Sequence, residues 1–262
     1  MPTGNYADVN GIRMYYEIHQ PTQANSNIIP LVLIHGGGST IQSTFGNVLS
    51  LFAQQYKVIA VELQAHGRTS DRNAPESFEQ DADDVAALLE HLNISKANIL
   101  GFSNGGSTTM RIATRHAGLV NKIVVIAAFY QRNGMLPGFF EMMQRATIND
   151  MPQALKDAFL KVTPDTAKLH NMFEKDRSRM ANFKDWTDAD LKAIKAPALI
   201  ISGDKDVASN EHTVKMSRLI AGSELMILPG VHGECIGEVE TAKPGSKLPE
   251  LTVAVITEFL QK

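Results

Sequence analysis

The chain has 262 residues, which is long enough for one large domain or two small ones with a substantial core. Its apolar fraction of 44% and charged fraction of 20% are ordinary for a globular protein, and a net charge of −3 gives no basic surface for nucleic acid or an anionic membrane. The single cysteine, Cys235, excludes an internal disulfide and a thiolate metal cluster.

The sequence also indicates where the protein works. No apolar run approaches the roughly 18 residues that cross a bilayer. The opening residues, "MPTGNYADVN", lack the basic and apolar regions of a signal peptide. We therefore expect a cytoplasmic protein without a membrane or nucleic-acid partner, as a monomer or homodimer.

The first predicted element is an antiparallel hairpin over residues 6–20 that turns at Asn10-Gly11. Helices are predicted at 77–94, where Ser77 and Gln80 have capping-box spacing, and at 248–260, where Leu251, Val255 and Phe259 have helical spacing. Between the hairpin and the C-terminus, apolar runs predict strands covered on both faces, at 30–36, 57–63, 97–102, 122–129, 197–203 and 224–230. Strands that alternate with helices predict an α/β fold with a parallel sheet.

Residues 130–194 interrupt this alternation, because they contain helical patterns and no convincing strand. Six of the eleven methionines fall here, at 135, 142, 143, 151, 172 and 180. Two interpretations stay open: these side chains pack a helical insertion onto the sheet, or they line an apolar pocket under a lid. We predict a core of residues 1–129 and 195–262 with a helical cap at 130–194.

The stretch "GFSNG" places Ser103 in a G-x-S-x-G pattern between a predicted strand and a predicted helix. Glycines on both sides allow a sharp, strained turn that exposes the serine hydroxyl at a helix N-terminus, where negative charge is favoured. Ser103 is therefore the candidate nucleophile.

A serine nucleophile needs a base and a group that orients the base. His232 follows the last predicted strand and is the candidate base. Asp204 and Asp206 both follow the strand at 197–203, and we favour Asp206 because it lies deeper in the loop. All three residues follow the carboxyl ends of strands, where open α/β sheets place their sites.

The glycine-rich turn "HGGGS" is the candidate source of an oxyanion hole, formed by the N–H groups of Gly37 and Asn104. Phosphate binding is disfavoured, because neither a P-loop nor a G-x-G-x-x-G pattern is matched. His35 and His66 are interpreted as packing or turn residues. No histidine and carboxylate cluster has zinc spacing, so we expect neither a metal nor a cofactor.

The sequence resembles the α/β-hydrolase-fold proteins over nearly its whole length, in the branch of small carboxylesterases, enol-lactone hydrolases and methyl-ester hydrolases. The resemblance rests on "HGGGS", "ELQAHGRTS", "GFSNGG", "SGDKD" and "GVHGE". It implies an eight-stranded, mostly parallel sheet flanked by helices, with an inserted helical cap. Glu62 and Ala65 replace the family's usual aspartate and glycine, and Gly37 replaces a bulkier residue, which leads us to expect a more open oxyanion site.

From these observations we expect a serine hydrolase with a Ser103–His232–Asp206 triad, acting on a small-molecule carboxylic ester or lactone. Alternatives on this fold are a lyase, a C–C hydrolase, a cofactor-independent oxygenase or perhydrolase, and a ligand receptor of low turnover. The residues expected to line the substrate pocket are Gly38, Phe129, Phe139, Met142 and Met143.

Overall fold

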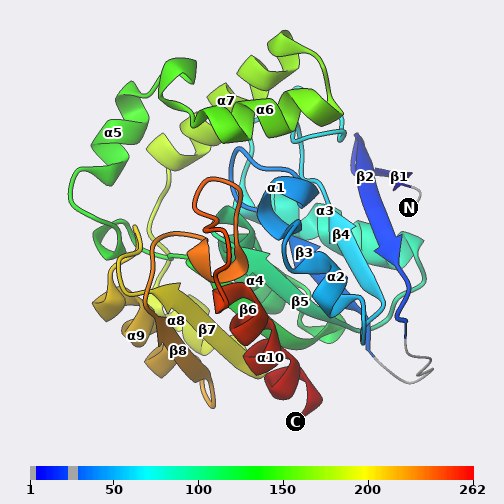
Figure 1. Cartoon of the computed structure of the whole chain (residues 1–262), viewed down its shortest axis with the longest axis vertical. Coiled ribbons are helices and arrows are strands. Elements are labelled where there is room, and N and C mark those ends of the chain that lie inside the picture. Colours follow the sequence, from blue (N-terminus) through cyan, green and yellow to red (C-terminus); the bar gives the residue numbers. More distant parts are fainter. Residues whose placement is uncertain (1–3, 23–28) are drawn as a thin grey trace.

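The computed structural model describes residues 4–22 and 29–262 (Figure 1). Positions 1–3 and 23–28 lie outside the described residues. Both belong to the predicted core segment 1–129, and positions 1–3 also belong to the opening stretch considered above as a signal peptide. The described chain forms one eight-stranded sheet in the order β1-β2-β4-β3-β5-β6-β7-β8. The strands are β1 (Gly4–Val9), β2 (Ile12–His19), β3 (Leu31–Ile34), β4 (Val58–Val61), β5 (Ala97–Phe102), β6 (Val120–Ile126), β7 (Ala198–Gly203) and β8 (Glu224–Leu228).

The sheet is mostly parallel. β1 and β2 form the predicted hairpin, whose turn residues Asn10 and Gly11 have φ of 44° and 84°. Such left-handed angles at both central positions are typical of the tight hairpin turn that Asn-Gly favours. β2 then pairs antiparallel with β4, and all later neighbours are parallel.

Alternate strand residues point to opposite faces, and each face has its own helical layer. Val32 and Ile34 pack in a core with α3 (Phe78–His91), α4 (Asn104–Arg115), α8 (Asp188–Lys192) and α9 (Asn210–Leu219). Leu31 and Leu33 pack in the opposite core with α1 (Ile41–Phe45), α2 (Leu49–Phe52) and α10 (Leu248–Gln261), which lie in front of the sheet in Figure 1. The predicted α/β fold, a mostly parallel eight-stranded sheet flanked by helices, is confirmed.

One prediction about burial is wrong. β8 is the outer strand of the sheet, so Leu225 and Ile227 are 41% and 36% exposed and the strand is not covered on both faces. In α10, Leu251 is 49% exposed. The inward stripe of that helix passes through positions four and seven residues apart, at Thr252, Ile256 and Phe259, and Leu251 lies beside it.

The segment between β6 and β7 is helical, as the sequence predicts. It contains α5 (Phe139–Arg145), α6 (Gln153–Val162), α7 (Thr166–Ala181) and α8, with 3₁₀ turns at Arg132–Gly134 and Ile148–Asp150; further turns are Ala117–Leu119 and Glu234–Ile236. α5, α6 and α7 lie together beyond one end of the sheet (Figure 1). α6 and α7 share a small core that includes Leu155, Phe159, Leu169 and Met172. The exact extent of a cap domain stays a prediction.

None of the helices in the described ranges is both long enough and apolar enough to cross a bilayer.

The junction of β5 and α4 depends on glycine. A Cβ on Gly101 would lie 2.0 Å from the Gly105 carbonyl oxygen, and a Cβ on Gly105 would lie 2.2 Å from the Ile34 carbonyl oxygen of β3. Both neighbours are backbone atoms that cannot rotate away. The helix therefore packs against the sheet at a distance that only glycine permits.

We expect Gly105→Ala to destabilise the protein by about 3 kcal/mol, since overpacking against backbone cannot relax by a change of rotamer. Thermal unfolding measures this as a lower Tm. The matched control is Gly118→Ala, where a Cβ would meet nothing within 4 Å. Equal melting temperatures for the two variants would contradict the close approach of α4 to β3.

Candidate active site

Ser103 lies where β5 ends and α4 begins. Its backbone has φ of 55° and ψ of −120°, a conformation that residues with side chains rarely adopt. The Ser103 N–H donates to the Ile126 carbonyl of β6 at 2.8 Å. The sheet thus holds the strained turn, and the hydroxyl stands at the helix N-terminus, as predicted.

His232 and Asp206 reach Ser103 from two other loops. His232 Nε2 lies 3.0 Å from Ser103 Oγ, and His232 Nδ1 lies 2.7 Å from Asp206 Oδ1. Asp206 follows β7 and His232 follows β8, so the loops of neighbouring parallel strands meet at one edge of the sheet. The structure brings the three sequence-predicted residues into one chain of hydrogen bonds.

The contacts of Asp204 and Asp206 differ. The Asp206 side chain is 1% exposed and also accepts the Val207 N–H at 2.7 Å. Burial raises the pKa of Asp206, but the hydrogen bond and charge of His232 outweigh it, so the pKa lies below its ordinary value. Asp204 instead accepts the Gly230 N–H at 2.7 Å and joins two loops. The structure places Asp206, and not Asp204, beside the histidine.

His35 fixes the loop at residues 35–40, which follows β3. Its Nε2 accepts the Leu63 N–H at 3.0 Å, and its Nδ1 donates to the Gly36 carbonyl at 2.7 Å. Burial and the nearby charge of His66 lower the pKa of His35 to about 3, so the ring is neutral. The interpretation of His35 as a turn residue agrees with these contacts.

The predicted oxyanion donors lie on this loop and at the start of α4. In the part of the chain that the structure describes, the N–H groups of Gly37 and Asn104 have no hydrogen-bond partner. The expectation of an open site at Gly37 is wrong. A Cβ there would lie 2.5 Å from Asn104 Nδ2 and 2.9 Å from Asp176 Oδ2, because these two polar side chains fill the space that a bulkier residue would take.

A cavity of about 360 Å³ lies beside Ser103 and His232. Its wall is mainly apolar and contains all five predicted pocket residues, Gly38, Phe129, Phe139, Met142 and Met143. Phe129 is buried, whereas Met142 is 57% exposed and lies at the rim. The charged residues of the wall are Asp150, Asp176, Arg177 and Glu240.

A larger hollow of about 860 Å³ lies on the other side of α7, and none of the cavity residues lines it.

Glu62 and Ala65, the two departures from the family pattern, have structural contacts. The fully buried Glu62 carboxylate accepts the N–H of Arg68 at 2.7 Å and its Nε–H at 3.0 Å. Ala65 has φ of 61°, which explains why glycine is usual there. Both residues shape the loop that carries His66.

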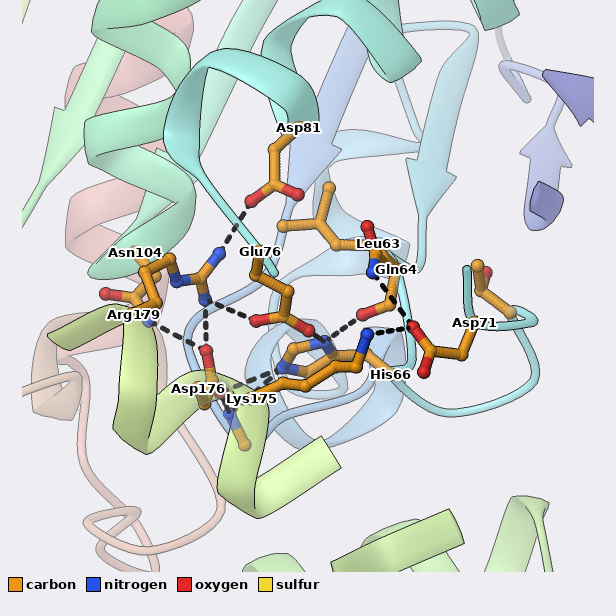
Figure 2. Close-up of polar contacts among 12 residues, drawn as sticks. Leu63, Gln64, His66, Asp71, Glu76, Asp81, Asn104, Lys175, Asp176 and Arg179 are labelled. Atoms are coloured by element: carbon orange, nitrogen blue, oxygen red, sulfur yellow. Dashed lines mark hydrogen bonds and ion pairs between the residues drawn. The ribbon is translucent and has the colours of Figure 1, made fainter. Parts of the chain in front are cut away.

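Charged side chains gather around His66 and Asp176 (Figure 2), and these two residues contact the Gly38 N–H of the 35–40 loop. Arg179 of α7 pairs with Asp81 of α3 at 2.7 Å and, by a shorter contact, with Asp176. Glu76 lies 3.6 Å from Arg179 and 3.9 Å from His66. We call His66, Glu76, Asp81, Asp176 and Arg179 the buried ion cluster. Among the described residues, no three His, Cys, Asp or Glu side chains are arranged to hold a metal ion.

His66 is a cation in this cluster. Its Nδ1 lies 2.8 Å from the Gln64 carbonyl oxygen, and its Nε2 lies 2.9 Å from Asp176 Oδ2. A ring that faces acceptors on both sides carries a proton on both nitrogens. Burial lowers the pKa of His66, but Asp176 and Glu76 outweigh burial and raise it to about 9. The interpretation of His66 as a packing or turn residue missed this charge.

The cluster is electrically balanced when Glu76 is protonated. Burial raises the pKa of Glu76 to about 8 despite the nearby Arg179. Burial acts in the same direction on Asp176, but Arg179 and His66 hold the pKa of that carboxyl well below its ordinary value. The positive charges of His66 and Arg179 then match the negative charges of Asp81 and Asp176.

A weak signal in the sequence pointed to Asp176 and Arg179. The buried stripe of α7 begins with Leu169 and Met172, and helical spacing continues it to Asp176 and Arg179. A charged residue at a position where the helical periodicity predicts an apolar residue indicates a buried polar contact. The spacing does not name the partner, which here lies far away in the chain.

A family model described as "alpha/beta hydrolase fold" matches residues 29–163, or 135 of the 262 residues. The chain belongs to this family. An AB hydrolase superfamily protein of Bacillus subtilis is 27% identical over 75% of this chain and 82% of its own length. A non-heme haloperoxidase of Rhodococcus erythropolis is 26% identical over 81% of this chain and 88% of its own.

Solved structures of the family have the same fold. The enol-lactonase of Burkholderia xenovorans LB400 superimposes with a TM-score of 0.75 at 21% identity, covering 98% of this chain and all of that one. At this identity the likeness concerns the fold of the α/β hydrolase and not its substrate.

From the buried ion cluster we predict that the protein loses stability as the pH rises from 5 to 9. The contribution of Glu76 to the free energy of unfolding is fully present below its ordinary pKa of 4.5 and is lost as the pH rises through about 8. The contribution of His66 is fully present below its ordinary pKa of 6.5 and is lost as the pH rises through about 9. We therefore expect Tm to fall from pH 5 to pH 9 and Glu76→Gln to flatten the decline. A flattening of about 2–4 °C corresponds to roughly 1 kcal/mol in a chain of this size.

The control for this experiment is Glu90→Gln, at an exposed position of α3, which should keep the slope of the unaltered protein. An equally steep decline in the Glu76→Gln protein would show that Glu76 does not hold a proton in the folded state.

Proposed function

We propose that this α/β hydrolase is a serine hydrolase that cleaves a small-molecule carboxylic ester or lactone through an acyl-enzyme. The observation that carries the proposal is the hydrogen-bonded chain from Ser103 Oγ through His232 to Asp206 at the wall of a mainly apolar cavity. An activated serine needs this order of nucleophile, base and orienting carboxylate.

In the proposed mechanism, Ser103 Oγ attacks the carbonyl carbon while His232 Nε2 takes its proton. Asp206 holds the histidine ring and stabilises the imidazolium that forms. The oxygen that gains negative charge is held by the free N–H groups of Gly37 and Asn104. His232 then gives the proton to the leaving alcohol, and water releases the acyl group by the same steps. In a lactone, the leaving alcohol remains attached to the acyl chain.

The cavity favours a neutral and compact acyl group. Its volume of about 360 Å³ is at the small end of ligand pockets. Apart from Asp176, whose charge the buried ion cluster balances, its wall carries the carboxylates of Asp150 and Glu240 against the Arg177 guanidinium. Repulsion by these carboxylates should disfavour an anionic acyl group.

The haloperoxidase relative supports testing a second reaction at the same serine. Hydrogen peroxide in place of water at the acyl-enzyme would release a peracid and restore the Ser103 hydroxyl. If a peracid forms only when the ester, the peroxide and Ser103 are all present, the protein has this second activity. If no peracid forms, hydrolysis is the only proposed reaction.

The triad is tested with a fluorophosphonate probe and p-nitrophenyl acetate. Ser103→Ala should lose labelling and hydrolysis while remaining folded. Asp206→Asn should lower kcat about 10⁴-fold, because asparagine favours the wrong tautomer of His232. Asp204→Asn is the matched control and should have a much smaller effect. Comparable turnover in Ser103→Ala would refute the serine mechanism, and a larger effect at Asp204 would refute the choice of acid.

The cavity is tested with p-nitrophenyl esters from acetate to palmitate. Each buried methylene should contribute about 0.8 kcal/mol, or nearly fourfold in kcat/KM, until the cavity is full. We expect a maximum at short to medium chains. Met172→Ala, at a fully buried cavity position, should move the maximum to longer chains, whereas the more exposed Met142→Ala should change it less. A flat profile, or a maximum at palmitate, would refute the enclosed pocket.

A further inference from the structure

The carboxylate of Asp176 extends from α7 to the residues around the candidate oxyanion site. It accepts the Gly38 N–H, and its Oδ1 lies 3.3 Å from Asn104 Nδ2. Its Oδ2 would lie 2.9 Å from a Cβ on Gly37. One side chain from the helical segment 130–194 therefore bonds to Gly38 and Asn104 and fills the space beside Gly37.

The core offers no equivalent anchor for this part of the loop. In the described ranges, the other acceptor near the Gly38 N–H is His66 Nε2 at 3.3 Å. That nitrogen carries the proton that it donates to Asp176, so it cannot also accept a hydrogen bond from the Gly38 N–H. Gly38 has φ of 66° and lies in the turn between β3 and α1, outside any strand or helix. The charge-assisted bond to Asp176 is what holds its N–H.

An isolated carboxylate beside a developing oxyanion would oppose catalysis, because like charges repel strongly in a site sheltered from water. The buried ion cluster removes this conflict. Asp176 bonds to the His66 cation at 2.9 Å and to the Arg179 guanidinium, which is itself held by Asp81 at 2.7 Å. Asp176 can therefore act as a hydrogen-bond acceptor without presenting a net charge to the site.

We propose that Asp176 is a positioning residue of this hydrolase: it fixes the 35–40 loop against Asn104 so that the Gly37 and Asn104 N–H groups converge on the oxyanion. His66 and Arg179 balance its charge. The inference rests on the proposed serine mechanism and adds to it that docking of α7 completes the oxyanion site.

The test compares Asp176→Asn with the unaltered protein on p-nitrophenyl acetate. A misplaced oxyanion donor acts mainly in the transition state, so kcat should fall about 10²-fold with little change in KM. The matched control is Asp157→Asn in α6, an exposed aspartate that accepts a hydrogen bond from the Gln153 side chain, and it should leave both constants unchanged. Thermal unfolding shows whether each variant is folded.

A second readout separates positioning from general stability. Phenylboronic acid forms a tetrahedral adduct with the Oγ of an active serine. In this adduct, a hydroxyl oxygen on the boron occupies the place of the oxyanion. Asp176→Asn should weaken this adduct by a factor close to the loss of kcat, while the KM for the ester changes little. Asp176→Glu keeps the charge but moves the carboxylate, so it should also lose kcat, and it serves if the asparagine variant does not fold.

The pH profile provides a third readout. His66 faces Asp176 and Arg179 from α7, Glu76 from the segment before α3, and the neutral His35 ring at 4.9 Å. Ionisation of Glu76 near pH 8 and loss of the His66 proton near pH 9 leave the Asp176 charge unbalanced, so kcat should fall above about pH 8. Asp176→Asn removes that charge and should lack this alkaline decline.

The outcomes separate the two proposals. If the unaltered protein neither reacts with the fluorophosphonate nor hydrolyses esters, the proposed function fails. If it does both, and folded Asp176→Asn keeps its kcat, its boronate affinity and its alkaline decline, the serine mechanism stands and the role of Asp176 is refuted. An equal loss in Asp157→Asn would also refute it, because the effect would not be specific to the loop contact.

Discussion

The close approach of α4 to β3 and β5 is the constraint on which the site depends. Gly101 and Gly105 remove the side chains that would keep the helix from the strands, so the backbone at Ser103 turns sharply between them. The same contact reaches the Ile34 carbonyl, immediately before the 35–40 loop. The nucleophile and the loop that carries the candidate oxyanion donors are therefore placed relative to each other by backbone packing, before any side chain of the site contributes.

The parts of the structure with local causes could be predicted from the sequence. Apolar runs form β3 to β7 because both faces of these strands are covered, and Asn10-Gly11 alone sets the first hairpin. Ser103, Asp206 and His232 could be found for a topological reason: each follows a strand, and parallel strands deliver their following loops to one edge. The position of a residue directly after a strand therefore predicts that it lies at this edge of the sheet.

The remaining parts depend on contacts between distant segments. Asp176 meets Gly38 across 138 residues, and nothing in the spacing of α7 names that partner. The protonated state of His66 follows from acceptors on both sides of its ring, which no local pattern reveals. β8 was misjudged because an apolar run does not tell whether its strand is central or at the edge of the sheet.

His35 and His66 lie next to each other with ring centroids 4.9 Å apart, yet their pKa values are displaced in opposite directions, to about 3 and about 9. Between about pH 4 and pH 8 neither ring changes its charge. One ring is a neutral spacer and the other a permanent cation. The charge that the two histidines place behind the 35–40 loop therefore stays constant over this range, although an unperturbed histidine titrates within it.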